Sequence, residues 1–182
     1  MEIFVIRHTA TLLKKGICYG QAEVPLDKQL FHLALPGILS KLPRTVAVIY
    51  SSPLTRCSAL AAKLLYKAYP EAELILDDRL KELDFGEWEL KNWNDINQQD
   101  LEKWMLNFDI EKVPGGESFL QLQERVTQFW RAFCARGETG CIVTHHGVII
   151  SLLSIINNTA IKDAFQLYHA DFGEVFCIKT HD

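Results

Sequence analysis

The interpretation of the fold begins at the stretch Glu2-Ile3-Phe4-Val5-Ile6-Arg7-His8-Thr9. Its four consecutive apolar residues favour a strand and lack helical spacing, so they predict a strand buried on both faces. Arg7 and His8 follow where the chain leaves the core. Ligands of open α/β sheets bind beyond the carboxyl ends of the strands, and a guanidinium beside an imidazole suits an oxyanion such as phosphate. Taken alone, however, the octapeptide is more simply a strand followed by a surface loop.

A second segment, Cys141 to Leu153, repeats this pattern. Its apolar run predicts a strand that ends at His145 and His146, and a new apolar run after Gly147 predicts a helix. The free N–H groups and the dipole at a helix N-terminus favour an anion. We therefore expect His145 to lie at the same sheet edge as Arg7 and His8.

A third segment lies between these two. Residues 45–50 predict a strand, Ser52 can cap a following helix, and Pro53 suits the first helical position. Arg56 then falls in the first turn of this helix. Three strand ends thus deliver two arginines and two or three histidines, a convergence much less expected by chance than any single segment.

The composition is that of an ordinary globular protein. The chain has 182 residues, of which 48% are hydrophobic and 23% charged, and these values favour one domain over residues 1–182. A net charge of −4 argues against non-specific binding to nucleic acid or to an anionic membrane. No apolar run is long enough to span a bilayer or to form the core of a signal peptide. Five cysteines without paired spacing predict reduced thiols in the cytoplasm.

Strand and helix patterns alternate along the chain, which predicts an α/β fold with a sheet between two layers of helices. A helical pattern at 28–42 contains Pro36-Gly37, which should kink it or delay its start. The clearest helix has one apolar face over residues 119–133. The other predicted elements are strands at 3–6, 45–50, 74–76, 141–145 and 174–178 and helices at about 53–69 and 147–156.

An acidic segment at residues 77–89 has no clear period, and a solvated loop is its simplest interpretation. A site that gathers cations for a phosphate ester also needs a proton donor for the leaving oxygen. Glu82 lies between apolar residues and is the carboxyl group most suited to partial desolvation. Glu87 and Glu89 are second choices.

Four segments resemble the histidine phosphatase superfamily, which includes the phosphoglycerate mutases. They are Arg7-His8-Thr9, Ser52-Pro53-Leu54-Thr55-Arg56, Leu80-Lys81-Glu82 with Phe85-Gly86-Glu87-Trp88-Glu89, and Val143-Thr144-His145-His146-Gly147. They occur in the order of the family and span nearly the whole chain. The resemblance implies a three-layer α/β/α sandwich with a mostly parallel six-stranded sheet.

The resemblance also implies roles for these residues. His8 would be the nucleophile, Arg7, Arg56 and His145 the phosphate pocket, and Glu82 the proton donor. A neutral imidazole attacks phosphorus without first losing a proton, and flanking arginines disfavour its protonation. His145 would add a donor if it were protonated against the phosphate. No cofactor is expected, and no metal either, because adjacent histidines diverge and further ligands at suitable spacing are missing.

Several positions depart from the family pattern. Thr9 and His146 stand where glycines are usual, Lys14 replaces an asparagine, and Leu90 replaces a glycine. Thr9 is expected either to reshape the pocket floor or to donate to phosphate, and His146 either to crowd the pocket or to contact substrate.

Two further segments, Gly16 to Leu26 and Pro114 to Ser118, look most like the α-ribazole phosphatase branch. That branch acts on α-ribazole 5′-phosphate in cobalamin biosynthesis. In the first of these segments, Tyr19 and Gln21 either reach over a ligand or form a structural turn.

A lid-like segment is predicted at residues 90–117, and it carries Trp93 and Trp104. The simpler interpretation is that these side chains pack the segment onto the core. The sharper hypothesis is that one of them stacks on an aromatic leaving group.

Three functions are carried forward. The first is a phosphomonoesterase with a phosphohistidine intermediate, whose partner is a small-molecule phosphate ester. The second is a phosphoglycerate mutase-type phosphotransferase, which usually devotes more chain to closing the site. The third is a non-catalytic phosphate-binding module. The oligomeric state stays open, with a homodimer as one alternative.

Overall fold

The computed structural model describes residues 2–179, and its centre is a five-stranded sheet in the order β3-β2-β4-β1-β5. Strands β1 to β4 are parallel where they pair, and β5 runs antiparallel to β1 at one edge. The bounds are β1 Glu2–Arg7, β2 Val48–Ser51, β3 Glu73–Leu76, β4 Gly140–Thr144 and β5 Val175–Lys179.

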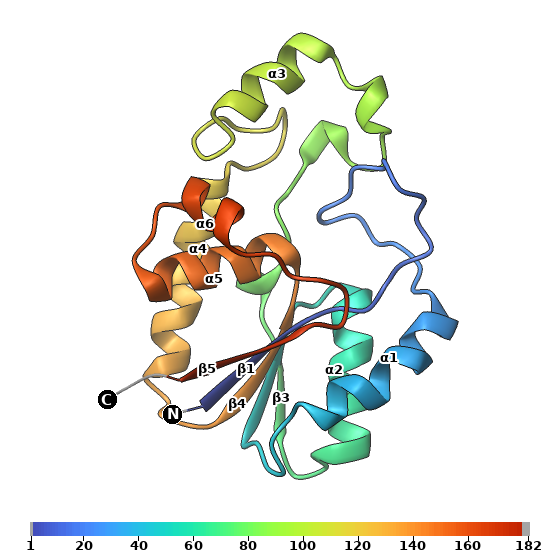
Figure 1. Cartoon of the computed structure of the whole chain (residues 1–182), viewed down its shortest axis with the longest axis vertical. Helices are drawn as coiled ribbons and strands as arrows, with labels where there is room; N and C mark the ends of the chain where they lie inside the picture. Colours follow the sequence, from blue (N-terminus) through green and yellow to red (C-terminus); the bar gives the residue numbers. More distant parts are fainter. Residues whose placement is uncertain (1, 180–182) are drawn as a thin grey trace.

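Helices cover both faces of this sheet (Figure 1). On one face lie α1 (Lys28–Ser40) and α2 (Thr55–Ala68), and on the other lie α4 (Phe119–Cys134), α5 (His146–Asn157) and α6 (Ile161–Leu167). Strand β1 serves both layers, because Ile3 and Val5 pack with α4 and α5 while Phe4 and Ile6 pack with α1 and α2. The prediction of a strand buried on both faces is therefore confirmed.

The prediction of six mostly parallel strands is wrong in its number. Within residues 2–179 the sheet has five strands, four of them parallel. The residues themselves predicted only these five, and the sixth came from the resemblance alone. Strand β5 is antiparallel to β1, so its last residue Lys179 pairs with Glu2, at the end of β1 away from Arg7.

The starts of α1 and α2 can be compared with their predictions. Helix α1 begins at Lys28, the first residue of the predicted pattern, so Pro36 lies inside the helix and does not delay its start. The side chain of Asp27 accepts from the N–H groups of Gln29 and Leu30 and caps the first turn. Helix α2 begins at Thr55, with Leu54 at the N-cap instead of Ser52.

The prediction for α4 is confirmed. Ser118 and Gln121 form a capping box at its start. The predicted apolar face is buried and consists of Phe119, Leu122, Val126, Phe129 and Phe133. This helix packs against α5 and against the segment that follows β3. It therefore supports two parts of the chain that carry predicted site residues.

Two helices were not predicted, α6 and α3 (Gln98–Leu106). Helix α3 lies apart from the sheet, at the top of Figure 1, within the predicted lid-like segment. A small apolar cluster of Cys18, Trp88, Ile96 and Val113 holds this region together, with Trp93 and Trp104 packed against it. Among residues 2–179 no single helix has the length and apolarity to span a membrane, and α5 with α6 meets those criteria only as a pair bent by 110°.

Candidate active site

A cavity of about 220 Å³ lies beyond the carboxyl ends of β1 and β4. The parallel register explains the convergence, because Arg7 of β1 pairs with Thr144 of β4 and Ser51 of β2 pairs with Val143. The residues that follow each of these strands therefore lie at the same edge of the sheet. The lining consists of Arg7, His8, Ile17, Tyr19, Arg56, Glu82, Phe85, Trp93 and His145.

His8 follows β1 and is almost completely buried. Its Nδ1 lies 2.8 Å from the carbonyl oxygen of Thr9, which can only accept a hydrogen bond. Nδ1 therefore carries the proton, and the lone pair of Nε2 is available to an electrophile. Burial, followed by the positive charge of Arg56, holds the pKa of His8 well below 6.5. The imidazole is consequently neutral at physiological pH.

Arg56 is the second residue of α2, and its side chain is 0% exposed. Its Nη1 donates to the carbonyl oxygen of Ala22 at 2.9 Å, its Nη2 to that of Gly20, and its Nε to Nδ1 of His145 at 3.3 Å. These bonds use three of the five N–H groups of the guanidinium. Within the described chain, one N–H on each terminal nitrogen is left for an anion in the cavity.

Arg7 enters the cavity from the end of β1. Its Nη1 donates to the carbonyl oxygen of Ala170 at 2.6 Å, and its guanidinium lies 4.0 Å from the centre of the Phe172 ring. Within residues 2–179 its Nε is buried without a hydrogen-bond partner. Because Arg7 also lines the cavity, its guanidinium is a donor suited to an oxyanion there.

His145 is the N-cap residue of α5, and its ring centre lies 5.2 Å from that of His8. Because the Nε of Arg56 can only donate, Nδ1 of His145 accepts and Nε2 carries the proton, which it donates to Ser52 Oγ at 2.8 Å. Burial and then the neighbouring His8 hold the pKa of His145 well below 6.5. The free site thus contains a neutral His145, whose protonation would have to accompany anion binding.

Glu82 lines the same cavity. Its Oε1 accepts from the N–H of Leu83 at 2.9 Å and its Oε2 from the N–H of Gly147 at 3.1 Å. A Cβ atom on Gly147 would lie 2.5 Å from Oε1 of Glu82, so only glycine allows this close approach. The carboxyl group is therefore held at the N-terminus of α5, next to His145.

The remaining predicted substrate-binding residues are placed differently. Tyr19 lines the cavity, with its ring 5.4 Å from the Cζ of Arg56. Gln21, Thr9 and His146 are absent from the cavity lining. Gln21 donates to the carbonyl oxygen of Glu82 at 3.1 Å, and Thr9 is buried with an unpaired hydroxyl among the described residues. His146 faces the carbonyl oxygen of Ala170 at 3.3 Å.

The two second-choice acids do not line the cavity. Glu87 is exposed, whereas the carboxylate of Glu89 accepts from the backbone N–H groups of four residues. These four are Gly20, Gln21, Ala22 and Phe85. Glu89 therefore shapes the turn whose carbonyl groups receive Arg56.

The other departures from the family pattern lie outside the cavity. Lys14 is exposed. Leu90 has a φ of +63°, in the left-handed region where glycine is favoured, and a leucine there costs about 1–2 kcal/mol. This left-handed conformation explains why glycine usually occupies this position in the family.

Two residues near the site were missed by the sequence interpretation. Ser52 was assigned to a helix cap, but its Oγ accepts from His145 and from the N–H of Leu54 at 3.3 Å. Phe172 lies over the guanidinium of Arg7, and the centre of the Phe172 ring is 5.4 Å from that of the His8 ring. The Phe172 side chain is 43% exposed. It stands in a loop near the end of the chain, where no motif marks it. Among residues 2–179 no group of three or more His, Cys, Asp or Glu side chains is arranged to hold a metal ion.

The lowered pKa values of His8 and His145 predict a loss of stability in acid. Below about pH 6.5 the unfolded chain takes up protons on both histidines that the folded chain does not bind. As the pH is lowered below this value, the free energy of unfolding should therefore decrease, by up to about 1.4 kcal/mol per pH unit for each histidine. Urea unfolding in phosphate-free buffer at about pH 7.5 and pH 5.5 measures this, and His145→Gln should lose less than the parent. Equal losses would contradict the prediction.

Comparison with known proteins identifies the family. The model of the histidine phosphatase superfamily (branch 1) matches residues 3–182. The adenosylcobalamin/alpha-ribazole phosphatase of Escherichia coli strain K12 is 27% identical over 175 residues, covering 85% of this chain and 78% of the relative.

Two solved structures share the fold. The alpha-ribazole phosphatase from Shigella flexneri superimposes with a TM-score of 0.87 at 23% identity, over 100% of this chain and 91% of that one. A mycobacterial glucosyl-3-phosphoglycerate phosphatase gives a TM-score of 0.81 at 19% identity, over 99% and 90% of the two chains. Because the family model matches almost the full length of the chain, the chain belongs to branch 1 of the histidine phosphatase superfamily.

Proposed function

We propose that this protein is a phosphomonoesterase that acts through a phosphohistidine on His8, and that its substrate is a phosphate ester of an aromatic nucleoside such as α-ribazole 5′-phosphate. One observation carries the proposal. The neutral His8, with its Nε2 lone pair free, shares one small cavity with two guanidiniums and the carboxyl group of Glu82. These groups are suited to act as the nucleophile, the charge-stabilising donors and the proton donor, which supports the proposal.

In the first step, Nε2 of His8 attacks phosphorus. The new P–N bond forms as the P–O bond to the leaving group breaks, and the leaving oxygen takes the proton of Glu82. Arg7 and Arg56 donate to the equatorial oxygens, where phosphoryl transfer requires positioning and charge stabilisation.

In the second step, water attacks the phosphohistidine. Glu82, now ionised, takes one proton of the water as the P–O bond forms and the P–N bond breaks. His8 returns to its neutral form and inorganic phosphate is the product. The hydrogen bond from Nδ1 to Thr9 holds the imidazole in one orientation through both steps.

The leaving group would face an apolar wall. Ile17, Tyr19, Phe85 and Trp93 line the cavity beside the catalytic groups. Trp104 lies behind Trp93, with the two rings stacked at 6.3 Å and 25°, and packs the lid-like segment. Of the two tryptophans, Trp93 is therefore the one available to an aromatic leaving group.

Replacing Trp93 by leucine should weaken the preference for an aromatic leaving group. We expect the ratio of kcat/KM for α-ribazole 5′-phosphate to that for a simple alkyl phosphate to fall by about 3- to 10-fold, since stacking contributes about 0.5–1.5 kcal/mol. Trp130→Leu is the matched control, because Trp130 stacks on Phe133 on α4 and lies outside the cavity lining. An unchanged ratio in Trp93→Leu would exclude the stacking role.

Residues 90–117 are proposed as the lid-like part of a single domain that spans 1–182. The packing of Trp93 and Trp104 on the cluster around Cys18 supports a segment that is attached to the domain while lining its cavity. The five free cysteines among the described residues are consistent with the proposed cytoplasmic location.

A panel of phosphomonoesters tests the function. Purified protein is assayed for phosphate release from α-ribazole 5′-phosphate, phosphoserine, glucosyl-3-phosphoglycerate and an alkyl phosphate, and for isomerisation of 3-phosphoglycerate. We expect phosphate release, fastest from α-ribazole 5′-phosphate. Isomerisation faster than phosphate release would instead identify a mutase, and phosphate binding without turnover would identify a binding module.

A further inference from the structure

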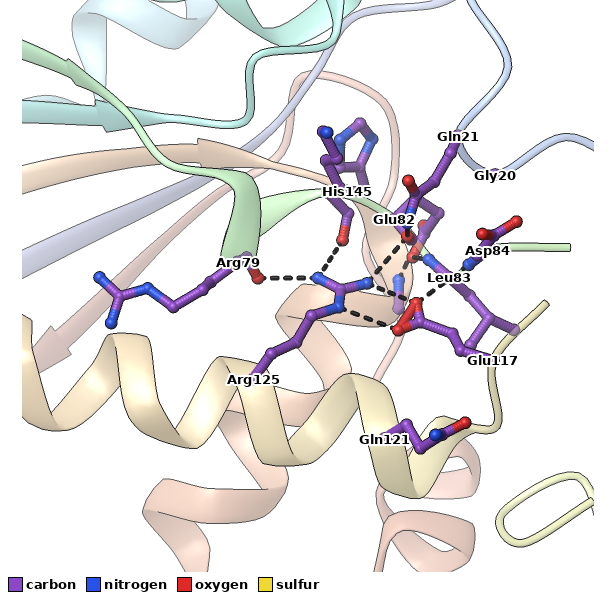
Figure 2. Close-up of polar contacts among 12 residues, drawn as sticks. Gly20, Gln21, Arg79, Glu82, Leu83, Asp84, Glu117, Gln121, Arg125 and His145 are labelled. Atoms are coloured by element: carbon purple, nitrogen blue, oxygen red, sulfur yellow. Dashed lines mark hydrogen bonds and ion pairs between the residues drawn. The ribbon is translucent and has the colours of Figure 1, made fainter. Parts of the chain in front are cut away.

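An ion pair beneath the cavity joins α4 to the chain that precedes it. Arg125 donates to Glu117 through Nε to Oε1 at 3.0 Å and through Nη2 to Oε2 at 2.7 Å (Figure 2). The two side chains are only 19% and 16% exposed. This two-point geometry fixes the plane of the guanidinium.

The same guanidinium binds the backbone that carries Glu82. Its Nη1 donates to the carbonyl oxygens of Arg79 at 2.7 Å and Lys81 at 2.6 Å, and its Nη2 donates to that of Glu82 at 2.9 Å. Together with the ion pair, these bonds use all five N–H groups of Arg125. A lysine, with a single nitrogen, cannot reproduce them.

Glu117 binds the same backbone segment directly. Its Oε2 also accepts from the N–H of Asp84 at 3.1 Å. The segment from Arg79 to Asp84 is thereby held at three carbonyl groups and one N–H by a single pair of side chains. After the short helical turn Asp78–Leu80, this segment contains neither strand nor helix that would otherwise fix its path.

The position of the Glu82 carboxyl group depends on this backbone. Its Oε1 is bound to the N–H of the next residue, Leu83, so any shift of the peptide moves the carboxyl group with it. Its Oε2 accepts from the N–H of Gly147 at 3.1 Å, so a shifted carboxyl group would also lose this bond. A misplacement of about 1 Å is enough to cost a proton-transfer step a factor of about 10².

We propose that the Glu117–Arg125 pair is a positioning device for the proton donor Glu82. The inference rests on the proposed function and adds to it two residues outside the cavity lining. The alternative is that the pair only stabilises the fold. The two roles differ in their dependence on the leaving group, because only a loss of proton donation affects poor leaving groups selectively.

The test compares 4-nitrophenyl phosphate, whose leaving group departs without a proton, with an alkyl phosphate, whose leaving group needs one. The parameter is kcat/KM, which reports the steps up to phosphorylation of His8 for both substrates. Arg125→Lys and Glu117→Gln should lower kcat/KM for the alkyl phosphate at least about 10-fold more than for 4-nitrophenyl phosphate. Arg131→Lys, on the exposed face of the same helix, is the matched control and should change neither.

Glu82→Gln supplies the reference, since it should show the same selective loss in larger measure. Adding Arg125→Lys to Glu82→Gln should cause no further selective loss, because the group being positioned is already inactive. If Arg125→Lys fails to fold, Glu117→Gln keeps the test intact, since its amide oxygen still accepts from Arg125.

Equal losses for both substrates in a folded variant would overturn the positioning role and leave the phosphatase assignment standing. If Glu82→Gln itself lowered kcat/KM equally for both substrates, the role of Glu82 and the positioning role would be overturned together. Absence of hydrolysis in the parent protein would overturn the proposed function first.

Discussion

Replacing His8 by alanine is expected to lower kcat/KM for phosphomonoester hydrolysis by about 10⁴-fold or more, to the level left when a covalent nucleophile is removed. The remaining arginines would still bind the substrate, but the imidazole proposed to accept the phosphoryl group would be missing. Rapid quenching of the parent protein during turnover should trap an acid-labile phosphohistidine, visible by intact-protein mass spectrometry. The same experiment on His8→Ala should show no phosphorylated protein.

His32→Ala is the matched control, because this histidine is exposed on α1 and lies outside the cavity lining. It should hydrolyse the substrate and trap phosphate like the parent. Phosphorylation that persists in His8→Ala would assign the nucleophile to another residue and refute the mechanism. Since His8 is buried, the fold of the variant is checked by thermal unfolding before the rates are interpreted.

Arg56→Lys should lower kcat/KM by about 10²- to 10³-fold, the range typical for removal of a preorganised donor to transition-state charge. Lysine keeps the charge but not the fork, and Arg56 uses its fork to bind Gly20, Ala22 and His145 while facing the cavity. The affinity for inorganic phosphate as a competitive inhibitor should fall together with kcat/KM.

Arg44→Lys provides the comparison, because Arg44 is an exposed arginine outside the cavity lining. Its kinetic constants should match those of the parent. If Arg56→Lys bound inorganic phosphate as tightly as the parent, the assignment of Arg56 to the phosphate pocket would be wrong.

Local patterns predicted the central elements because the determining forces act over a few residues. The apolar run before Arg7 requires burial on both faces, and the regular apolar spacing along α4 requires one buried face. The convergence of Arg7, Arg56 and His145 was also predictable, since parallel strands release their next residues at one edge.

Contacts between distant segments could not be predicted in this way. Phe172 lies over Arg7 although the two residues are 165 positions apart in the sequence and no pattern marks the loop of Phe172. Arg125 stands beside the apolar face of α4, and a polar residue at such a position is normally assigned to solvent. Ser52 had good helix-capping chemistry but serves His145 instead, because α2 begins three residues later.

By itself, the sequence determined the layers of the fold and the identity of the charged groups that meet beyond the strand ends, because hydrophobic periodicity and strand direction are encoded locally. The tertiary structure alone decided how those groups are held. Hydrogen bonds between segments far apart in the chain fix the proton position on His145, the position of the Glu82 carboxyl group beside Gly147 and the binding of Arg125 to the backbone. The proton position on His8 depends on the local turn that brings its Nδ1 to the carbonyl oxygen of Thr9. The bonds between distant segments form only after packing has brought their donors and acceptors within about 3 Å of each other.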